Sequence, residues 1–244
     1  MAGNWKMYKT PAETTSFFEK FRPLVEQSEH CEIVICPPFT NIAAAVGAAH
    51  ATRIRIGAQN LYWANAGAFT GEISAPMIQA AGCTYVIVGH SERRQYFGET
   101  NETVLKRTEA ALAAGLTPIV CVGELLEHRE GGHTEAVMVE QCQKGILPLT
   151  LEQFSRIVIA YEPVWAIGTG KTATPEIAAD AHRLLRGQMR ACYGQAAADA
   201  LRILYGGSVK PDNVRSLMAQ PEIDGVLVGG ASLDANSFAS IVNF

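Results

Sequence analysis

Residues 157–171 read Ile157-Val158-Ile159-Ala160-Tyr161-Glu162-Pro163-Val164-Trp165-Ala166-Ile167-Gly168-Thr169-Gly170-Lys171. The first four residues form the apolar run that is typical of a fully buried strand. Glu162 stands where this run stops, and Pro163 predicts that the strand ends there, because proline has no N–H for a strand interior. The loop that follows is apolar, although loops are usually polar. A carboxylate before such a segment indicates a base under a closing lid, whereas a Glu in isolation is more often a solvated loop residue.

Short apolar runs alternate with amphipathic segments along the rest of the chain. The predicted strands are 32–36, 54–58, 84–88, 118–122, 157–161, 202–205 and 225–228, and the predicted helices include 14–26, 102–114, 135–145 and 175–192. The gaps are too long for hairpins, so we expect parallel strands with crossover helices, about eight βα units in all. A closed barrel and a doubly wound sheet both fit this pattern. A spacing of roughly 25 to 40 residues favours an α/β fold with a single (β/α)8 TIM barrel domain, and we expect it to span residues 1–244.

Composition excludes several classes of protein. The net charge is −4 with dispersed Lys and Arg, so we expect no nucleic acid partner. No segment approaches the roughly 18 apolar residues that would span a bilayer, and no apolar signal segment is present, so no membrane association is predicted. The cysteines form no C-x-x-C pair, which indicates free thiols in a reducing compartment and a cytoplasmic protein; they are Cys31, Cys36, Cys83, Cys121, Cys142 and Cys192.

Polar residues gather where the predicted strands end, which is where barrel enzymes carry their chemistry. These residues are Asn4, Lys6, His90, Glu162, 206–208 and 229–230. His90 enters a predicted helical turn, whose positive terminus disfavours imidazolium and leaves a neutral donor. Glu92 is expected to orient this region by pairing with Lys6 or with an arginine. The alternatives are a histidine that serves packing and a lysine that is only a surface charge.

Two glycine pairs follow the last two predicted strands, at 206–207 and 229–230. Such turns admit a close approach of the backbone to a ligand, and this part of a barrel commonly binds phosphate. Ser208 adds a hydroxyl donor beside the first pair. Each pair alone would be explained by a tight turn, and only their occurrence on adjacent strands favours a phosphate site.

Two other patterns do not predict a site. Residues 168–172 look like the end of a P-loop, but the full pattern needs a glycine where this chain has Trp165. His128 and His133 match no metal-ligand spacing, and we interpret them as surface residues. We therefore predict no metal and no cofactor.

Six segments together closely resemble the triosephosphate isomerase family. They are 3–7, 67–74, 88–94, 160–171, 205–209 and 224–231, and they occur along the whole chain in the family's order. The segments 88–94 (Val-Gly-His-Ser-Glu-Arg-Arg) and 160–171 are the most specific. The resemblance implies an isomerase that interconverts dihydroxyacetone phosphate and D-glyceraldehyde 3-phosphate through an enediolate in glycolysis and gluconeogenesis.

The resemblance also implies a role for each matching residue. Glu162 is implied to be the base, His90 the neutral electrophile, Lys6 a positive charge for substrate and enediolate, and Asn4 its neighbour in the site. Glu92 and Cys121 are implied to support them. The implied phosphate contacts are Gly168, Ser208, Gly229 and Gly230. The implied lid consists of Pro163, Val164, Trp165, Ala166, Ile167, Gly168, Thr169, Gly170 and Lys171.

Residues 67–74 resemble the family's dimer loop, which implies a homodimer. Phe69 and Ile73 fit an interface, Thr70 would lie near the partner's active site, and Met7 should lie nearby. The chain departs from the family at its start, where only two residues precede Gly3. We therefore expect a shortened first strand, and its pairing with the last strand is in doubt. Two rival functions are a barrel enzyme for a different phosphorylated substrate and a non-catalytic binding scaffold.

Overall fold

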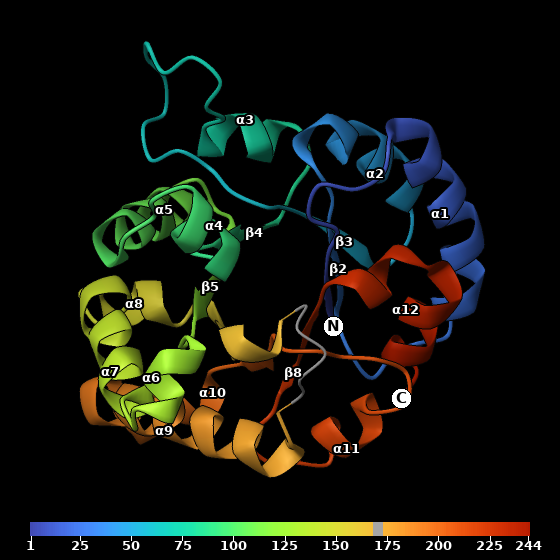
Figure 1. The fold of residues 1–244 in the computed structure, drawn as a ribbon. Coiled ribbons are helices and arrows are strands. Elements are labelled where there is room, and N and C mark those ends of the chain that lie inside the picture. The colour runs from blue at the N-terminus through green and yellow to red at the C-terminus, as the bar shows by residue number, and fades with distance from the viewer. Residues whose placement is uncertain (168–172) are drawn as a thin grey trace.

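The computed structural model describes residues 1–167 and 173–244, and within them eight parallel strands close into a barrel (Figure 1). Each strand pairs with its neighbours in sequence, and β1 closes the ring against β8. The strands are β1 (Ala2–Asn4), β2 (Ile33–Cys36), β3 (Ile54–Ala58), β4 (Tyr85–Val88), β5 (Thr117–Val122), β6 (Val158–Tyr161), β7 (Ile203–Tyr205) and β8 (Gly225–Val228). The predicted barrel is confirmed, and the doubly wound alternative is wrong.

Helices surround the strands in an outer ring, as Figure 1 shows. They are α1 (Pro11–Val25), α2 (Ile42–Ala49), α3 (Ala75–Ala80), α4 (Ser91–Tyr96), α5 (Asn101–Ala113), α6 (Leu126–Glu130), α7 (Thr134–Gly145), α8 (Leu151–Phe154), α9 (Pro175–Tyr193), α10 (Gln195–Ala200), α11 (Val214–Met218) and α12 (Ala235–Val242). Short 3-10 helices lie at Phe39–Asn41, Val164–Ala166 and Gly230–Leu233. Among the described residues, no helix combines the length and the apolarity that crossing a membrane would require.

The predicted helix at 14–26 begins three residues too late, and the reason is local. Thr10 caps α1, because its hydroxyl accepts from the N–H of Glu13 while the Glu13 carboxylate accepts from the N–H of Thr10. Pro11 occupies the first helical position, where its missing N–H costs nothing. The capping box therefore starts the helix before its first buried residue, and a pattern of apolar positions alone does not show it.

The first strand is short, as expected, yet it pairs on both sides. Ala2 and Gly3 lie in register with Leu227 and Val228 of β8, so the doubt about this pairing is wrong. Trp5, directly after β1, is fully buried and donates from its indole N–H to the carbonyl of Ser232 at 3.0 Å. This bond and the ladder to β8 together close the barrel.

The core has two parts, one inside the barrel and one between the strands and the helices. Side chains from most of the strands fill the interior, among them Val34, Ile87, Ile119 and Leu204. A larger apolar shell packs the helices onto the outer face of the barrel. All six cysteines are free, and burial raises the pKa of Cys142 to about 12, which keeps that thiol protonated at neutral pH.

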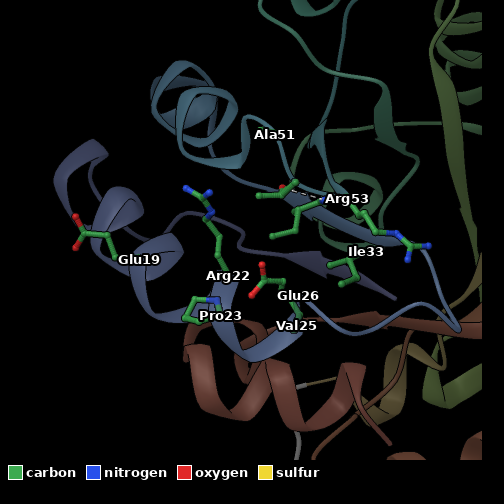
Figure 2. A pocket seen from close by; sticks show the side chains of 10 residues that line it. Glu19, Arg22, Pro23, Val25, Glu26, Ile33, Ala51 and Arg53 are labelled. Carbon is green, nitrogen blue, oxygen red and sulfur yellow. Dashed lines mark hydrogen bonds between the residues drawn. The ribbon is translucent and has the colours of Figure 1, made fainter.

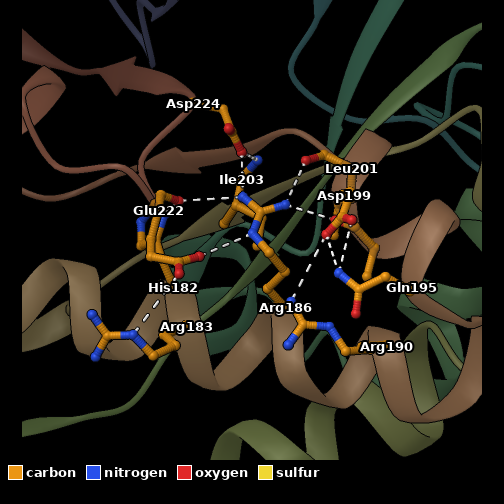
Figure 3. A network of polar contacts seen from close by, with 11 residues as sticks. His182, Arg183, Arg186, Arg190, Gln195, Asp199, Leu201, Ile203, Glu222 and Asp224 are labelled. Atoms are coloured by element: carbon orange, nitrogen blue, oxygen red, sulfur yellow. Dashed lines mark hydrogen bonds and ion pairs between the residues drawn. The ribbon is translucent and has the colours of Figure 1, made fainter.

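A buried arginine on α9 forms hydrogen bonds and ion pairs with residues at the amino-terminal end of the barrel (Figure 3). Arg186 donates to the carbonyls of Ala198 and Leu201 at 2.7 and 2.8 Å, and it pairs with Glu222 at 3.0 Å and Asp224 at 2.7 Å. Asp224 in turn accepts from the N–H of Ile203, the first residue of β7. One guanidinium thus joins α9, the segment before β7 and the segment before β8.

Candidate active site

A cavity of about 520 Å³ opens at the rim formed by the carboxyl ends of the strands. Most of the residues predicted for substrate chemistry line it, namely Asn4, Lys6, His90, Glu162, Ser208, Gly229 and Gly230. They come from opposite sides of the barrel and from both ends of the chain. Gly168 is the one predicted phosphate contact that lies outside the described residues.

Glu162 is buried at the end of β6, with 2% of its surface exposed, so it is not a solvated loop residue. One carboxylate oxygen accepts from the N–H of Ser91 at 2.8 Å, and the other lies 2.9 Å from Nε2 of His90. Burial alone would raise the pKa of this carboxyl group. His90, the Ser91 amide and Lys6 outweigh that effect, so the pKa is lowered and the group is held as a carboxylate.

His90 is the N-cap of α4, and its hydrogen bonds distinguish the two ring nitrogens. Nδ1 accepts from the N–H of Glu92 at 3.2 Å, so this nitrogen carries no proton. Nε2 then carries the proton and donates to the Glu162 carboxylate. Burial lowers the pKa of the ring, but the carboxylate of Glu162 more than offsets this, and the net shift is upward. Protonating the ring fully would break the cap bond, so the geometry favours the neutral tautomer.

Lys6 is held in an unusual backbone conformation, with φ of 51°. Its N–H donates to the Asn4 side chain at 3.0 Å, and its carbonyl accepts from Nε2 of Gln59 at 2.8 Å. Its ammonium group lies 2.5 Å from the Glu92 carboxylate, so the structure places Glu92 against Lys6 and not against an arginine. Gln59 was not predicted from the sequence, because an amide after β3 carries no distinctive pattern.

The glycine pair at 206–207 leaves room for the side chain of Glu162. A Cβ atom on Gly206 would lie 3.0 Å from Cγ of Glu162, and the N–H of Gly206 donates to the carbonyl of Tyr161 at 2.7 Å. The other pair begins the 3-10 helix Gly230–Leu233, with Gly229 as its N-cap and Gly230 as its first residue. Both pairs face the same cavity as Lys6, as the sequence predicted from their positions.

The first part of the predicted lid forms a short 3-10 helix at Val164–Ala166. Trp165 is half-buried; its indole N–H donates to the carboxylate of Glu124 at 2.9 Å, and the guanidinium of Arg129 lies 4.7 Å from its ring centroid. Gly168, Thr169, Gly170 and Lys171 lie outside the described residues. Glu124 was missed, although it follows the end of β5 just as Glu162 follows β6. The same strand-end rule would have found it.

The remaining predicted residues do not line the cavity. Phe69, Thr70 and Ile73 lie in the loop before α3, which extends away from the barrel in Figure 1. Cys121 lies inside the barrel below Glu162, and burial together with that carboxylate raises the pKa of its thiol. His128, with 35% of its side chain exposed, and the exposed His133 lie at the surface, as predicted; Nδ1 of His128 accepts from the N–H of Leu125.

A second cavity of about 530 Å³ lies at the other end of the barrel (Figure 2). It is lined by the last turns of α1 and by the segment that leads into β3, including Arg22, Glu26 and Arg53. The charges in it are of both signs, and none of the predicted site residues reaches it. The rim cavity is therefore the candidate active site.

The chain is similar over its whole length to known proteins. The sequence profile of the triosephosphate isomerase family matches residues 1–244. The triosephosphate isomerase of Solibacter usitatus is 76% identical over 244 residues, covering 100% of this chain and 98% of that protein. That of Moorella thermoacetica is 56% identical and is covered to 97%. The crystal structure of the Bartonella henselae triosephosphate isomerase has a TM-score of 0.90 at 36% identity, covering 100% of this chain and 97% of that one.

The closed barrel and the cavity at its carboxyl rim place the chain in the class of (β/α)8-barrel enzymes. Within that class, the chain belongs to the triosephosphate isomerase family. It interconverts dihydroxyacetone phosphate and D-glyceraldehyde 3-phosphate, a reaction of glycolysis. The rival functions, another phosphorylated substrate and a non-catalytic scaffold, are therefore set aside.

Proposed function

We propose that Glu162, His90 and Lys6 perform this isomerisation as base, electrophile and electrostatic stabiliser. The observation that carries the proposal is the 2.9 Å contact between the Glu162 carboxylate and Nε2 of His90, in a cavity that Lys6 also lines. It places an ionised base, a neutral donor and a fixed positive charge around one small space. A proton beside a carbonyl is weakly acidic, so the base needs both other groups.

The Glu162 carboxylate removes a proton from the carbon beside the substrate carbonyl and returns it to the neighbouring carbon. Its lowered pKa keeps it ionised and ready to accept this proton. In the structure both of its oxygens are engaged, by the Ser91 N–H and by His90. The substrate must therefore displace at least one of these contacts before the base can reach carbon.

The two cationic or donor groups act on the substrate oxygens. His90 donates from Nε2 to the carbonyl oxygen and shuttles protons between the oxygens as the enediolate forms. The ammonium group of Lys6 stabilises the negative charge that develops there. The side-chain oxygen of Asn4 accepts from the backbone N–H of Lys6 and so helps to position that residue. Donors aimed at a developing oxyanion contribute roughly 10² to 10³ each in rate.

The phosphate group of the substrate is proposed to bind at Ser208, Gly229 and Gly230, with Gly168 from the lid. These described residues share the cavity with Glu162, on the side where β7 and β8 end. Binding the phosphate there uses remote contacts to close the segment 163–171 over the reacting carbons. Closure expels water and limits loss of phosphate from the enediolate.

We further infer that residues 1–244 form a single domain and that the chain works as a homodimer in the cytoplasm. Pairing of β1 with both β2 and β8 supports one domain, and six free thiols suit a reducing compartment.

Exposed apolar side chains suit a dimer interface, among them Met7, Phe69, Met77, Tyr96 and Phe97. Sedimentation of the Phe69→Arg variant is expected to show monomers; an unchanged dimer would contradict this interface.

The Glu162→Gln variant tests the proposed mechanism. Gln keeps the size and hydrogen-bonding reach of Glu but cannot take a proton, so turnover in a coupled isomerase assay should be lost. Binding of inorganic phosphate should be largely retained, because its proposed contacts lie elsewhere in the cavity. Near-normal turnover would remove Glu162 as the base.

A further inference from the structure

Gln141, on α7, holds the backbone of Gly123 with both ends of its amide. Oε1 accepts from the N–H of Gly123 at 2.8 Å, and Nε2 donates to the carbonyl of the same residue at 2.9 Å. Gly123 directly follows β5. Gln141 and Glu162 also line one cavity of about 250 Å³, beside the rim site.

The need for this amide follows from the end of β4. The last pair of residues in the β4–β5 ladder is Val88 with Val120, and Gly89 then turns the chain away with φ of 70°. In a parallel sheet, successive residues direct their N–H and C=O to opposite neighbours. Cys121 and Gly123 therefore face an edge that β4 no longer covers. Arg94 donates to the carbonyl of Cys121 at 3.2 Å, and Gln141 takes both groups of Gly123.

The other edge of this segment supports the base and the start of the lid. The N–H of Glu162 donates to the carbonyl of Val122 at 2.8 Å, and the N–H of Val164 donates to that of Glu124 at 3.1 Å. Between these two bonds, Gly123 lies against the backbone of Glu162, where a Cβ atom on the glycine would be 1.7 Å from the Glu162 carbonyl oxygen. Any shift of Gly123 is thus passed directly to Glu162.

We propose that Gln141 is a positioning residue for Glu162, acting through Gly123 and never touching the substrate. The inference rests on the proposed role of Glu162 as the base. A planar amide supplies one donor and one acceptor side by side, as the missing strand would. Leu, Met or an ionised Glu at this position cannot supply both. Without the amide, the two polar groups of Gly123 must find water or move, and Glu162 moves with them.

The Gln141→Met variant removes both hydrogen bonds and keeps the length of the side chain. Displacement of a reacting group by about 1 Å can cost roughly 10²-fold, so kcat should fall about 10- to 100-fold. KM should change less than about threefold, because the phosphate contacts do not depend on Gly123. The matched control is Gln143→Met, an exposed position on the same helix, which should keep the wild-type kcat. A folded Gln141→Met protein whose kcat stays within about twofold of wild type would overturn the proposal, because a displaced base should cost more than that.

The Gln141→Glu variant supplies a readout that a purely structural role would not move. A protonated carboxyl group has the same donor and acceptor pair as the amide, whereas the carboxylate lacks the donor. Its kcat relative to wild type at the same pH should be low at pH 8 and rise severalfold as the pH falls and the new carboxyl protonates. Taking the ratio to wild type cancels the titration of Glu162 itself. A ratio that does not vary with pH would count against Gln141 as an amide clamp, and this test does not depend on Gln141→Met folding.

A double mutant separates this proposal from the mechanism on which it rests. In the Glu162→Gln background, adding Gln141→Met should lower the residual activity no further, because no base remains to be positioned. A further loss equal to that of Gln141→Met alone would show that Gln141 acts elsewhere. If Glu162→Gln itself retains turnover, the proposed base is wrong whatever Gln141 does.

Discussion

The backbone of Gly123 packs against the carbonyl group of Glu162 so closely that a Cβ atom on Gly123 would lie 1.7 Å from that oxygen. Two strand ends, β5 and β6, are thereby held at a separation that no side chain on Gly123 could tolerate. The same pair of strand ends carries Glu124 and Glu162, which are both buried. The position of Glu162, the proposed base, thus depends on a glycine directly after the neighbouring strand.

Gly123→Ala should therefore lower kcat in the folded enzyme, an effect that a loss of stability alone would not produce. The added methyl group forces the 162–164 segment outward, and a displacement of about 1 Å at Glu162 should cost roughly 10²-fold in kcat. The control is Gly187→Ala within α9, where an added Cβ meets nothing within 4 Å. That change should leave kcat unaltered and raise stability by about 0.5 to 1 kcal/mol. A Gly123→Ala enzyme with normal kcat would show that the two backbones can separate without moving the base.

Glu162→Asp should fold normally yet lose roughly 10²-fold in kcat. The shorter side chain keeps a carboxylate but withdraws it from His90 and from the reacting carbon. Its contact with the Ser91 N–H should weaken as well, since that bond is 2.8 Å long with Glu. Steady-state kinetics with both triose phosphates provide the measurement. A kcat close to that of wild type in the Glu162→Asp variant would contradict the role of Glu162 as a closely positioned base.

Lys6→Ala should be inactive with its fold preserved. The ammonium group is partly exposed and its one carboxylate partner is Glu92, so its removal should cost little stability. Circular dichroism and thermal melting would check the fold, and the coupled assay would check turnover. Substantial isomerase activity in this variant would argue against electrostatic stabilisation by Lys6.

His182 should make stability fall on acidification. Burial lowers its pKa from 6.5 to about 4, and its Nδ1 bonds the carbonyl of Glu222 at 3.1 Å. Between these two values the unfolded chain binds more protons than the folded one, so stability rises with pH in this window. The loss from above pH 6.5 down to about pH 4 amounts to about 3 kcal/mol for this group.

The measurement is urea unfolding at a series of pH values. His182→Asn keeps a donor for Glu222 but cannot be protonated, so its stability curve should be flatter below pH 6.5. The exposed His50→Asn serves as the control and should leave the slope as in wild type. Parallel curves for His182→Asn and wild type would show that His182 does not set the slope.

Arg186→Met should destabilise the fold without changing the chemistry. It leaves the carbonyls of Ala198, Leu201 and Glu222 and the carboxylates of Glu222 and Asp224 without their common donor (Figure 3). Loss of one partner from a buried ion pair typically costs about 3 kcal/mol or more. Arg190→Met, on the same helix and half exposed, should cost less than about 1 kcal/mol. Equal unfolding free energies for the two variants would mean that the network around Arg186 contributes little.

Much of the fold follows from the pattern of the chain. Apolar runs such as 225–228 gave strands with the predicted bounds, because burial on both faces of a parallel strand demands an unbroken apolar run. Helix starts were less well predicted, and α1 begins at its capping box and not at its first buried residue. The pairing of β1 with β8 was underestimated, since a strand of three residues is stabilised by contacts far away in sequence.

The residues of the candidate site also fall into those that the sequence could indicate and those that it could not. Glu162, His90, Lys6 and the glycine pairs could be selected from the sequence because each stands where a strand ends, and all strand ends of a barrel share one rim. Gln59 and Gln141 could not be assigned their contacts, because an amide in a loop or on a helix shows no pattern of its own, whereas Glu124, near the end of β5, could have been found by the strand-end rule.

The sequence by itself determined the order of strands and helices, the rim on which polar residues gather, and the family. Only the tertiary structure decided that Lys6 pairs with Glu92, that His90 accepts at Nδ1, and that Gln141 and Gly123 lie behind Glu162. The reason is physical. The spacing of apolar residues in the sequence indicates which face of a helix or strand is buried. The partner of a polar group depends instead on distances between segments that come together only when the barrel closes.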